Sequence, residues 1–232
     1  MRVTAFVLPV LPGKEAELQS LARELESRST EYDEYRGRNG VTREAAFLQR
    51  TPQGSHVIIY RECDDSRGTQ PKSEGTFELW LTEGMSAVHG FDPTAAPQPK
   101  VELLVRHRPA RRGDVYISAF PVLPSKVARI HEFVGELTGI HGAEFEASLR
   151  RFGIGLTLLL QQFAQVELAI SVVEGDDPAS AFGKLAVSQH PFDRWHVQQI
   201  ADQAGIDFSA PPPPPNEELW SWDGGAVRAQ AV

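Results

Sequence analysis

The sequence predicts an α+β fold built from two tandem modules, each with the element order β-α-β-β-α-β. The first observation is an internal duplication: residues 3–65 recur without a gap as residues 115–177. The second is an apolar run of strand length at the start of each copy, followed by the same Pro-Val-Leu-Pro element and then a helix pattern. A period above 100 residues indicates a duplicated domain and excludes a solenoid of short repeats.

Each copy opens with one strand, Val3–Leu8 or Val115–Phe120, that the Pro-Val-Leu-Pro element ends because proline lacks the N–H that a sheet needs. A helix follows, since apolar residues recur at the spacing of a single helical stripe. The stripe comprises Leu18, Leu21, Ala22 and Leu25 in the first copy and Val127, Ile130, Phe133, Val134 and Leu137 in the second. Residues 32–38 and 144–151 either continue this helix or form a second short one.

Two strands joined by a tight turn come next. Ala45–Arg50 and His56–Glu62 flank Thr51-Pro-Gln-Gly54, which is a strong hairpin pattern. In the second copy Leu156–Gln162 pairs with Val166–Val173, a further helix begins at Pro178, and a helical turn follows Pro191. Each copy then ends in a short strand, Val101–Val105 or Glu218–Trp222. This order is that of a ferredoxin-like split βαβ module, present twice.

The duplication also suggests domain boundaries. We expect one module at residues 1–106, a polar linker at 107–114, the second module at 115–222 and a disordered tail at 223–232. The strands are apolar on both faces, and the helices of a module cover only one of them. Each sheet would therefore expose one apolar face to solvent. The sequence therefore predicts that the two modules pack sheet to sheet as an intrachain pseudo-dimer, with a homodimer as the further assembly to consider.

Composition restricts the partners and the compartment. The chain is 41% hydrophobic and 23% charged with a net charge of −8, which argues against nucleic acid as a ligand. Cys63 is the only cysteine, so no intrachain disulfide or thiolate metal site forms. The N-terminus lacks a signal-peptide pattern, and the longest apolar run is far too short to span a bilayer. We therefore expect a cytoplasmic protein that contacts no membrane.

No motif of a named catalytic machine is present, since Gly-x-Ser-x-Gly, His-Glu-x-x-His and the phosphate-binding glycine loops are all absent. The pairs Asp64-Asp65 and Asp176-Asp177 resemble metal carboxylates, but their place before a helix favours N-capping. We therefore expect no metal site.

Individual residues suggest where chemistry could occur. His141 continues the helical stripe and could shuttle protons or bind iron, or could be a capped or partly exposed histidine beside Gly142. His131 lies at the edge of the stripe. His196 could pair with Asp193, whereas Trp195 matches Trp80 of the first copy and could equally pack in a core. Tyr32, Tyr35, Arg36, Arg38 and Arg43 could bind an anionic or phenolic ligand, or could form a solvated helix face. Gln161 is a polar residue that could line a cavity.

Four segments carry a resemblance that covers nearly the whole chain: Leu11–Lys14, Gly40–Glu44, Arg50–Gly54 and Pro191–Trp195. They resemble the dimeric α/β-barrel superfamily, and most closely small bacterial members related to antibiotic-biosynthesis monooxygenases. Gly40–Glu44 has no close counterpart in the second copy, and Pro191–Trp195 survives only there, so at most one of two equivalent pockets is expected to work.

The resemblance implies an enzyme that converts an apolar or aromatic metabolite without an organic cofactor, as a monooxygenase, isomerase or cyclase. We expect His141, Tyr35 and His131 to be catalytic, and the substrate to contact Tyr32, Arg38, Gln161, Trp195 and His196. Haem is the alternative cofactor, with His131, His141 or His196 as its axial ligand. A non-catalytic ligand-binding or scaffold protein is the alternative function.

Overall fold

Two antiparallel sheets organise the chain into two compact units. The structure is a computed structural model that describes residues 1–64, 75–91, 100–162, 166–208, 214–224 and 227–229. Unit 1 contains Met1–Pro99 and Asn216–Val232, and unit 2 contains Lys100–Pro215. The predicted α+β class is confirmed.

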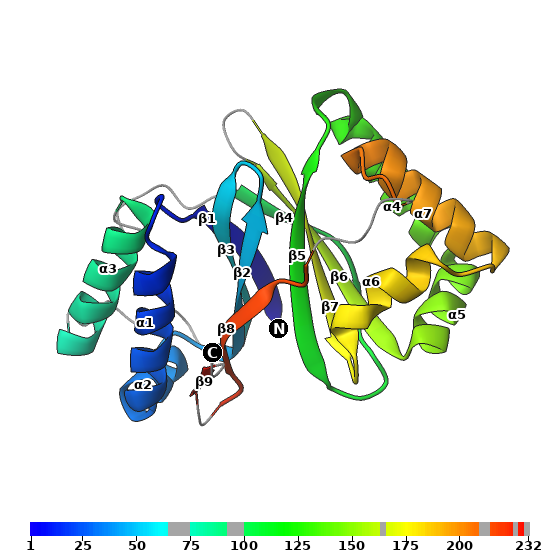
Figure 1. Cartoon of the computed structure of the whole chain (residues 1–232). Coiled ribbons are helices and arrows are strands. Elements are labelled where there is room, and N and C mark those ends of the chain that lie inside the picture. The colour runs from blue at the N-terminus through cyan, green and yellow to red at the C-terminus, as the bar shows by residue number, and fades with distance from the viewer. Residues whose placement is uncertain (65–74, 92–99, 163–165, 209–213, 225–226, 230–232) are drawn as a thin grey trace. The chain divides into compact units, whose positions relative to one another are not determined.

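In unit 1 the helices lie on one side of a five-stranded sheet, called sheet A, with strand order β1-β3-β2-β8-β9 (Figure 1). Its elements are β1 (Arg2–Pro9), α1 (Glu15–Ser27), α2 (Ser29–Arg38), β2 (Val41–Thr51), β3 (Gly54–Cys63), α3 (Thr76–His89), β8 (Glu217–Trp222) and β9 (Val227–Ala229). The predicted stripe on α1 is confirmed, because Leu18, Leu21, Ala22 and Leu25 are buried. The hairpin is confirmed by the pairing of Thr51 with Gly54.

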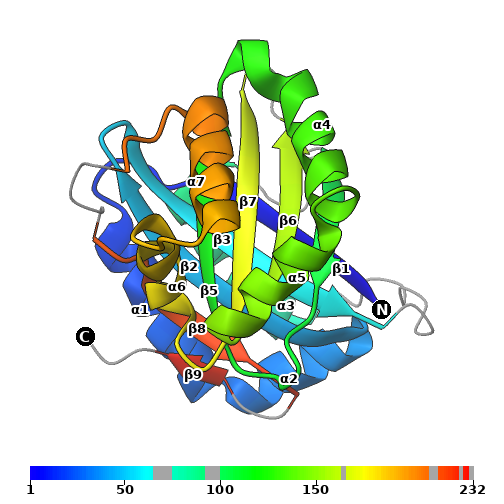
Figure 2. The same ribbon diagram turned by 90° about the vertical axis from the view of Figure 1, so that its right-hand side faces the viewer.

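In unit 2 the helices again cover one face of a sheet, called sheet B, with strand order β4-β6-β7-β5 (Figure 2). Its elements are β4 (Lys100–His107), β5 (Asp114–Val122), a 3₁₀ turn (Pro124–Lys126), α4 (Val127–Thr138), α5 (Gly142–Phe152), β6 (Ile154–Gln162), β7 (Glu167–Gly175), α6 (Pro178–Ala186) and α7 (Pro191–Ala204). The buried side of α4 contains the predicted Ile130, Phe133, Val134 and Leu137, while Val127 is only partly buried.

The last strand of each repeat lies in the sheet of the other repeat, which corrects the predicted modules. β4 ends the first repeat but pairs with β6 in sheet B, and β8 ends the second repeat but pairs with β2 in sheet A. The compact units therefore do not follow the predicted boundaries at residues 106 and 115. Local sequence identifies a strand, but the partner that the strand pairs with depends on contacts distant in the chain.

The predicted linker at 107–114 also has a different role. His107 belongs to β4 and Asp114 to β5, and these strands form the two edges of sheet B. The residues between them pass close to the ends of β6 and β7. A Cβ at Gly155 would lie 2.3 Å from Cδ of Pro109, and one at Gly113 would lie 2.4 Å from the carbonyl oxygen of Gly175. Only glycine allows so close an approach at these two positions.

The predicted disordered tail contains a strand. β9 pairs with β8 through Trp220–Ala229, Ser221–Arg228 and Trp222–Val227, and Val227 is buried. Val227–Ala229 forms a strand because β8 offers an unpaired edge and the unit 1 core offers Val227 an apolar contact.

Candidate functional site

The helix-covered faces of the two sheets differ in how far solvent reaches them. In sheet B a row of directly opposed residues runs across all four strands, namely Val105, Leu158, Ser171 and Ser118. Leu158 packs against the core beneath the helices, so this row faces them. All four side chains nevertheless remain partly exposed. The centre of this face is therefore an accessible surface, which we call the open row.

The matching row of sheet A is buried except at its edge residue Phe6, which is partly exposed. It consists of Trp220, Ala46, Ile59 and Phe6. Trp220, Ala46 and Ile59 are 2%, 0% and 1% exposed. Ile59 and Ser171 occupy equivalent positions of the duplication, so a β-branched apolar side chain in unit 1 is replaced by a hydroxyl in unit 2. Unit 2 is thus the unit whose helix-facing row is partly exposed along its whole length.

Aromatic side chains border the open row. The Phe120 ring of β5 stacks on Phe182 of α6 with 5.7 Å between ring centroids, and Phe182 lies 5.2 Å from Phe208. All three rings are partly exposed. Ser118 and Ser171 are directly opposed, so their hydroxyls share one spot on an otherwise apolar surface. The surface suits a flat apolar molecule with one polar group.

The adjacent row of sheet B contributes two polar rings, His107 and Tyr116, at its two edges. The His107 ring lies 6.3 Å from the ring of Phe145 on α5. Within the described part of the chain, its buried Nδ1 atom has no hydrogen-bond partner. The sequence predicts His107 in a polar linker after a strand that ends at Val105, whereas the structure extends β4 to His107.

Three of the predicted residues come together in unit 2. The rings of His141 and Trp195 are 4.2 Å apart, and Phe192 contacts His141, Trp195 and His196. His141 lies at the N-cap position of α5, where its Nδ1 is 2.6 Å from Oε2 of Glu144. The side chain of His141 is thus partly exposed and paired with a carboxylate, and it makes no capping hydrogen bond to the backbone of α5.

His196 is buried among Phe133, Phe145 and Phe192. Burial lowers the pKa of His196 to about 4, although the negative charge of Asp193 acts in the opposite direction. The imidazole is therefore neutral near pH 7. Asp193 is itself buried and accepts hydrogen bonds from Ser148, Arg151 and Ser188, and these bonds lower its pKa against the opposing effect of burial.

His131 and Gln161 lie away from this cluster. His131 is exposed, and its Nδ1 is 3.9 Å from Oε1 of Glu102. Gln161 is fully buried, but it follows Leu160, which packs under the helices, so its side chain points to the opposite face of sheet B. The structure does not place Gln161 on the same face as His141.

In unit 1 the predicted Tyr32 belongs to a buried charge network around Glu44. The carboxylate of Glu44 is fully buried and contacts Tyr32, Arg36, Arg61 and Trp220. Arg36 and the indole N–H of Trp220 donate to its Oε1 at 3.0 and 2.9 Å. Burial would raise the pKa of Glu44, but Arg36 and Arg61 outweigh that effect and lower the pKa to about 2. The Tyr32 hydroxyl is thus engaged inside the protein.

The other two predicted residues of unit 1 lie beside this network. Tyr35 is partly buried, with its ring 5.7 Å from Phe77 and the Arg36 guanidinium 4.9 Å from its ring centre. Arg38 is exposed and forms an ion pair with Glu78. Neither the network nor its members recur in unit 2, where Leu156 stands at the position of Glu44 and Ser148 at that of Arg36.

None of the helices in the described part of the chain is long and apolar enough to cross a bilayer. A search of the same residues for groups of three or more histidine, cysteine or acidic side chains that could hold a metal ion finds none.

Comparisons with known proteins support the fold and leave the activity open. Residues 1–99 match the sequence profile of a family of unknown function, DUF6176. This match ends at Pro99, where the N-terminal segment of unit 1 also ends. No curated protein is similar enough to count as a match.

Solved structures match over nearly the full chain. A protein of Fusobacterium nucleatum subsp. nucleatum, named as a candidate monooxygenase, superposes with a TM-score of 0.55 at 10% identity, covering 99% of this chain and 97% of that one. A second candidate monooxygenase, from Lactobacillus acidophilus, has a TM-score of 0.49 at 10% identity, covering 97% and 98%. An anthrone oxidase-like protein has a TM-score of 0.45 at 13% identity, covering 99% and 96%. The first of these matches shows that this chain shares the overall fold of a monooxygenase-like protein.

Proposed function

We propose that the protein is a small-molecule enzyme of the monooxygenase-like dimeric α/β-barrel type, acting in unit 2 without an organic cofactor. The observation that carries the proposal is the open row, since three of the four equivalent side chains are buried in unit 1 whereas all four are partly exposed in unit 2. The candidate monooxygenase with the same overall fold adds support at the level of fold alone.

The surface around the open row suits an aromatic metabolite that carries a hydroxyl or carbonyl group. Leu158 and Val105 offer an apolar floor, and the rings of Phe120 and Phe182 offer an aromatic border. The hydroxyls of Ser118 and Ser171 can donate to or accept from one polar group of the substrate. A single polar position on an apolar surface orients a flat ligand.

His107 is the proton acceptor that we propose. It lies two residues beyond Val105 on β4, at the end of the row adjacent to the open row. Removal of a proton from a phenol or an activated CH₂ group creates an electron-rich anion that can react with O₂ directly. Conversion of the CH₂ group to a carbonyl by one O₂ releases one water, so atoms and electrons balance without a further reductant. An isomerase or cyclase would use the same proton transfer.

His196 and His141 have supporting positions in this proposal. The neutral His196 contributes to the apolar wall behind Phe145, and His141 packs on Trp195. Unit 1 is proposed to be the structural partner, because its Glu44 network fills the equivalent space. The two sheets are proposed to correspond to the two halves of a dimeric α/β barrel.

A reciprocal exchange of equivalent residues tests the site. Ser171→Ile should fill the open row and weaken binding of 1-naphthol, followed by its fluorescence, by about tenfold or more while leaving thermal stability unchanged or higher. Ile59→Ser, the matched control, should destabilise unit 1 but keep naphthol binding while the protein is folded. Loss of binding in Ile59→Ser alone would place the ligand in unit 1 and contradict the proposal.

Oxygen uptake with a panel of phenols tests the activity. His107→Gln should lower the rate by about 100-fold or more while naphthol binding is retained, because only the proton transfer is removed. An absorption spectrum of the protein purified from its host tests the haem alternative, since bound haem would give an intense Soret band.

A non-catalytic ligand-binding protein is the second candidate. The missing partner at Nδ1 of His107 favours it, because catalytic histidines are usually oriented by a second group. If the wild type binds naphthol at the open row but takes up no oxygen with any phenol of the panel, the result would support a binding protein over an enzyme.

A further inference from the structure

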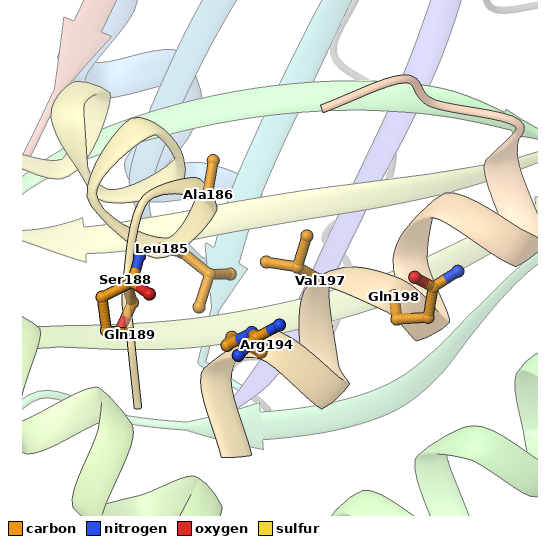
Figure 3. A pocket seen from close by; sticks show the side chains of 7 residues that line it. All are labelled: Leu185, Ala186, Ser188, Gln189, Arg194, Val197 and Gln198. Carbon is orange, nitrogen blue, oxygen red and sulfur yellow. The ribbon is translucent and has the colours of Figure 1, made fainter. Parts of the chain in front are cut away.

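A concave site lies on unit 2 between the end of α6 and the outer side of α7 (Figure 3). Its volume is about 360 Å³, within the range of small-molecule sites. Its lining residues are Leu185, Ala186, Ser188, Gln189, Arg194, Val197 and Gln198. Phe192 and His196 occupy the opposite, buried side of α7, so this pocket is separate from their cluster.

The pocket has an apolar part formed by two helices. Leu185 of α6 and Val197 of α7 approach each other across it, with Ala186 beside them (Figure 3). Leu185, Ala186 and Val197 are partly exposed, so a ligand body placed there would remove apolar surface from water.

The pocket also has a cation that the protein itself does not neutralise. Arg194 is exposed, and the structure gives its side chain no ion-pair partner within the described residues. The adjacent Asp193 is already engaged by Arg151 at 2.7 and 2.8 Å and by two serine hydroxyls. Lys184 is held by Asp177 at 2.9 Å. The guanidinium of Arg194 is thus the charged group that this pocket can offer to a ligand.

Two amides add hydrogen-bonding capacity around the guanidinium. Nε2 of Gln189 donates to the carbonyl of Val187 at 3.1 Å, and Nε2 of Gln198 donates to Asp202 at 2.9 Å. Each amide nitrogen carries a second hydrogen. The position equivalent to Arg194 in the first repeat is Leu79, so this combination belongs to unit 2 alone.

We propose that this pocket binds a small organic acid with an apolar body, its carboxylate on Arg194 and its body between Leu185 and Val197. Arginine suits this role because its planar fork binds both carboxylate oxygens at once. The site is independent of the activity proposed for the open row, and it remains valid if that activity fails.

Methyl-labelled full-length protein titrated with benzoate tests the site by NMR. Benzoate should shift the methyl resonances of Leu185, Ala186 and Val197, whereas benzamide, which has the same shape without the charge, should bind at least about tenfold more weakly. Arg194→Gln should weaken benzoate binding by about tenfold or more and leave benzamide binding unchanged. The matched control, Arg150→Gln, removes an exposed arginine of α5 and should bind benzoate like the wild type.

Val197→Phe is a second variant, because the larger side chain fills the pocket. It should abolish the benzoate-induced shifts of the Leu185 methyl resonances, while the rest of the spectrum remains that of a folded protein. Equal benzoate affinity in wild type and Arg194→Gln would overturn the proposal. Shifts confined to methyl groups outside the pocket would overturn it as well.

Discussion

Single residues explain most of the contrast between the two repeats. Glu44 is a fully buried carboxylate that stays ionised because two arginines, a tyrosine and a tryptophan surround it. The buried Glu44 thus requires polar partners in unit 1. Leu156, at the equivalent position of unit 2, places no such requirement on the residues around it.

Glu44→Gln should destabilise the protein by about 3–5 kcal/mol, because the neutral amide leaves the buried Arg36 without its counter-charge. Chemical denaturation measures the change. Glu31→Gln is the control, since Glu31 forms an exposed ion pair with Arg28, and little change is expected there. Equal effects of the two substitutions would contradict the proposed importance of the network.

The pKa of Glu44 also predicts the pH range in which acid destabilises the protein. It falls from 4.5 to about 2 on folding, so the unfolded chain binds the proton more readily. The stabilisation is complete above pH 4.5 and is lost as the pH falls toward 2, by about 3 kcal/mol. Denaturation curves between pH 2 and 6 should show this loss in the wild type and a flatter profile in Glu44→Gln. A parallel profile in the variant would assign the acid sensitivity to other carboxyls.

The pKa of His196 predicts a second pH range, above that of Glu44, in which the stability of the protein changes. Its pKa falls from 6.5 to about 4 on folding, so protonation favours the unfolded chain. Stability should therefore decrease by up to about 3 kcal/mol as the pH falls from 6.5 to 4. His196→Phe, which keeps the aromatic packing, should remove this part of the pH dependence. Histidine titration by NMR offers a direct check, and a His196 signal that titrates near pH 6.5 would contradict it.

At the scale of elements, β8 has specific anchors in unit 1. Glu217 binds Gln19 and Arg50 at 2.7 and 2.8 Å, Trp220 binds Glu44, and Trp222 donates to Asp33 at 3.2 Å. β4, which has the matching place in sheet B, offers Val105 opposite Leu158 where β8 offers Trp220 opposite Ala46. These contacts make sheet A the preferred partner of β8.

Trp220→Phe should destabilise the protein by about 1–3 kcal/mol, because it keeps an aromatic side chain but removes the indole N–H that donates to the buried carboxylate of Glu44. Trp80→Phe is the control. Trp80 is partly exposed and stacks under Arg28, whose guanidinium carbon lies 4.3 Å from the ring, so a cost of less than about 1 kcal/mol is expected. Thermal denaturation compares the two variants, and a larger cost for Trp80→Phe would count against the β8 anchor.

At the scale of the whole molecule, the strand exchange makes the two repeats depend on one another. Residues 1–110 would lack β8, and residues 111–232 would lack β4. We expect each fragment alone to be unfolded or self-associated, and an equimolar mixture to form a one-to-one complex with native circular dichroism. Light scattering after size exclusion tests this expectation. Two fragments that are folded monomers on their own would contradict it.

The sequence by itself determined the features that depend on neighbours in the chain. The hairpin at Thr51–Gly54 and the stripes of α1 and α4 follow from turn residues and local periodicity, and the structure confirms them. Of the candidate residues, sequence reasoning identified His141, Trp195 and His196, which lie together because the spacing along α7 and the end of α4 brings them near Phe192.

Tertiary structure alone decided which sheet each final strand enters and which repeat remains open. An unpaired strand edge accepts any strand with suitable side chains, so the choice depends on partners such as Glu44 and Trp220 that are 176 residues apart. His107, Ser118 and Ser171 escaped the sequence analysis for the same reason. They come onto one face of one sheet only when β4, β5 and β7 join that sheet, and they are partly exposed there.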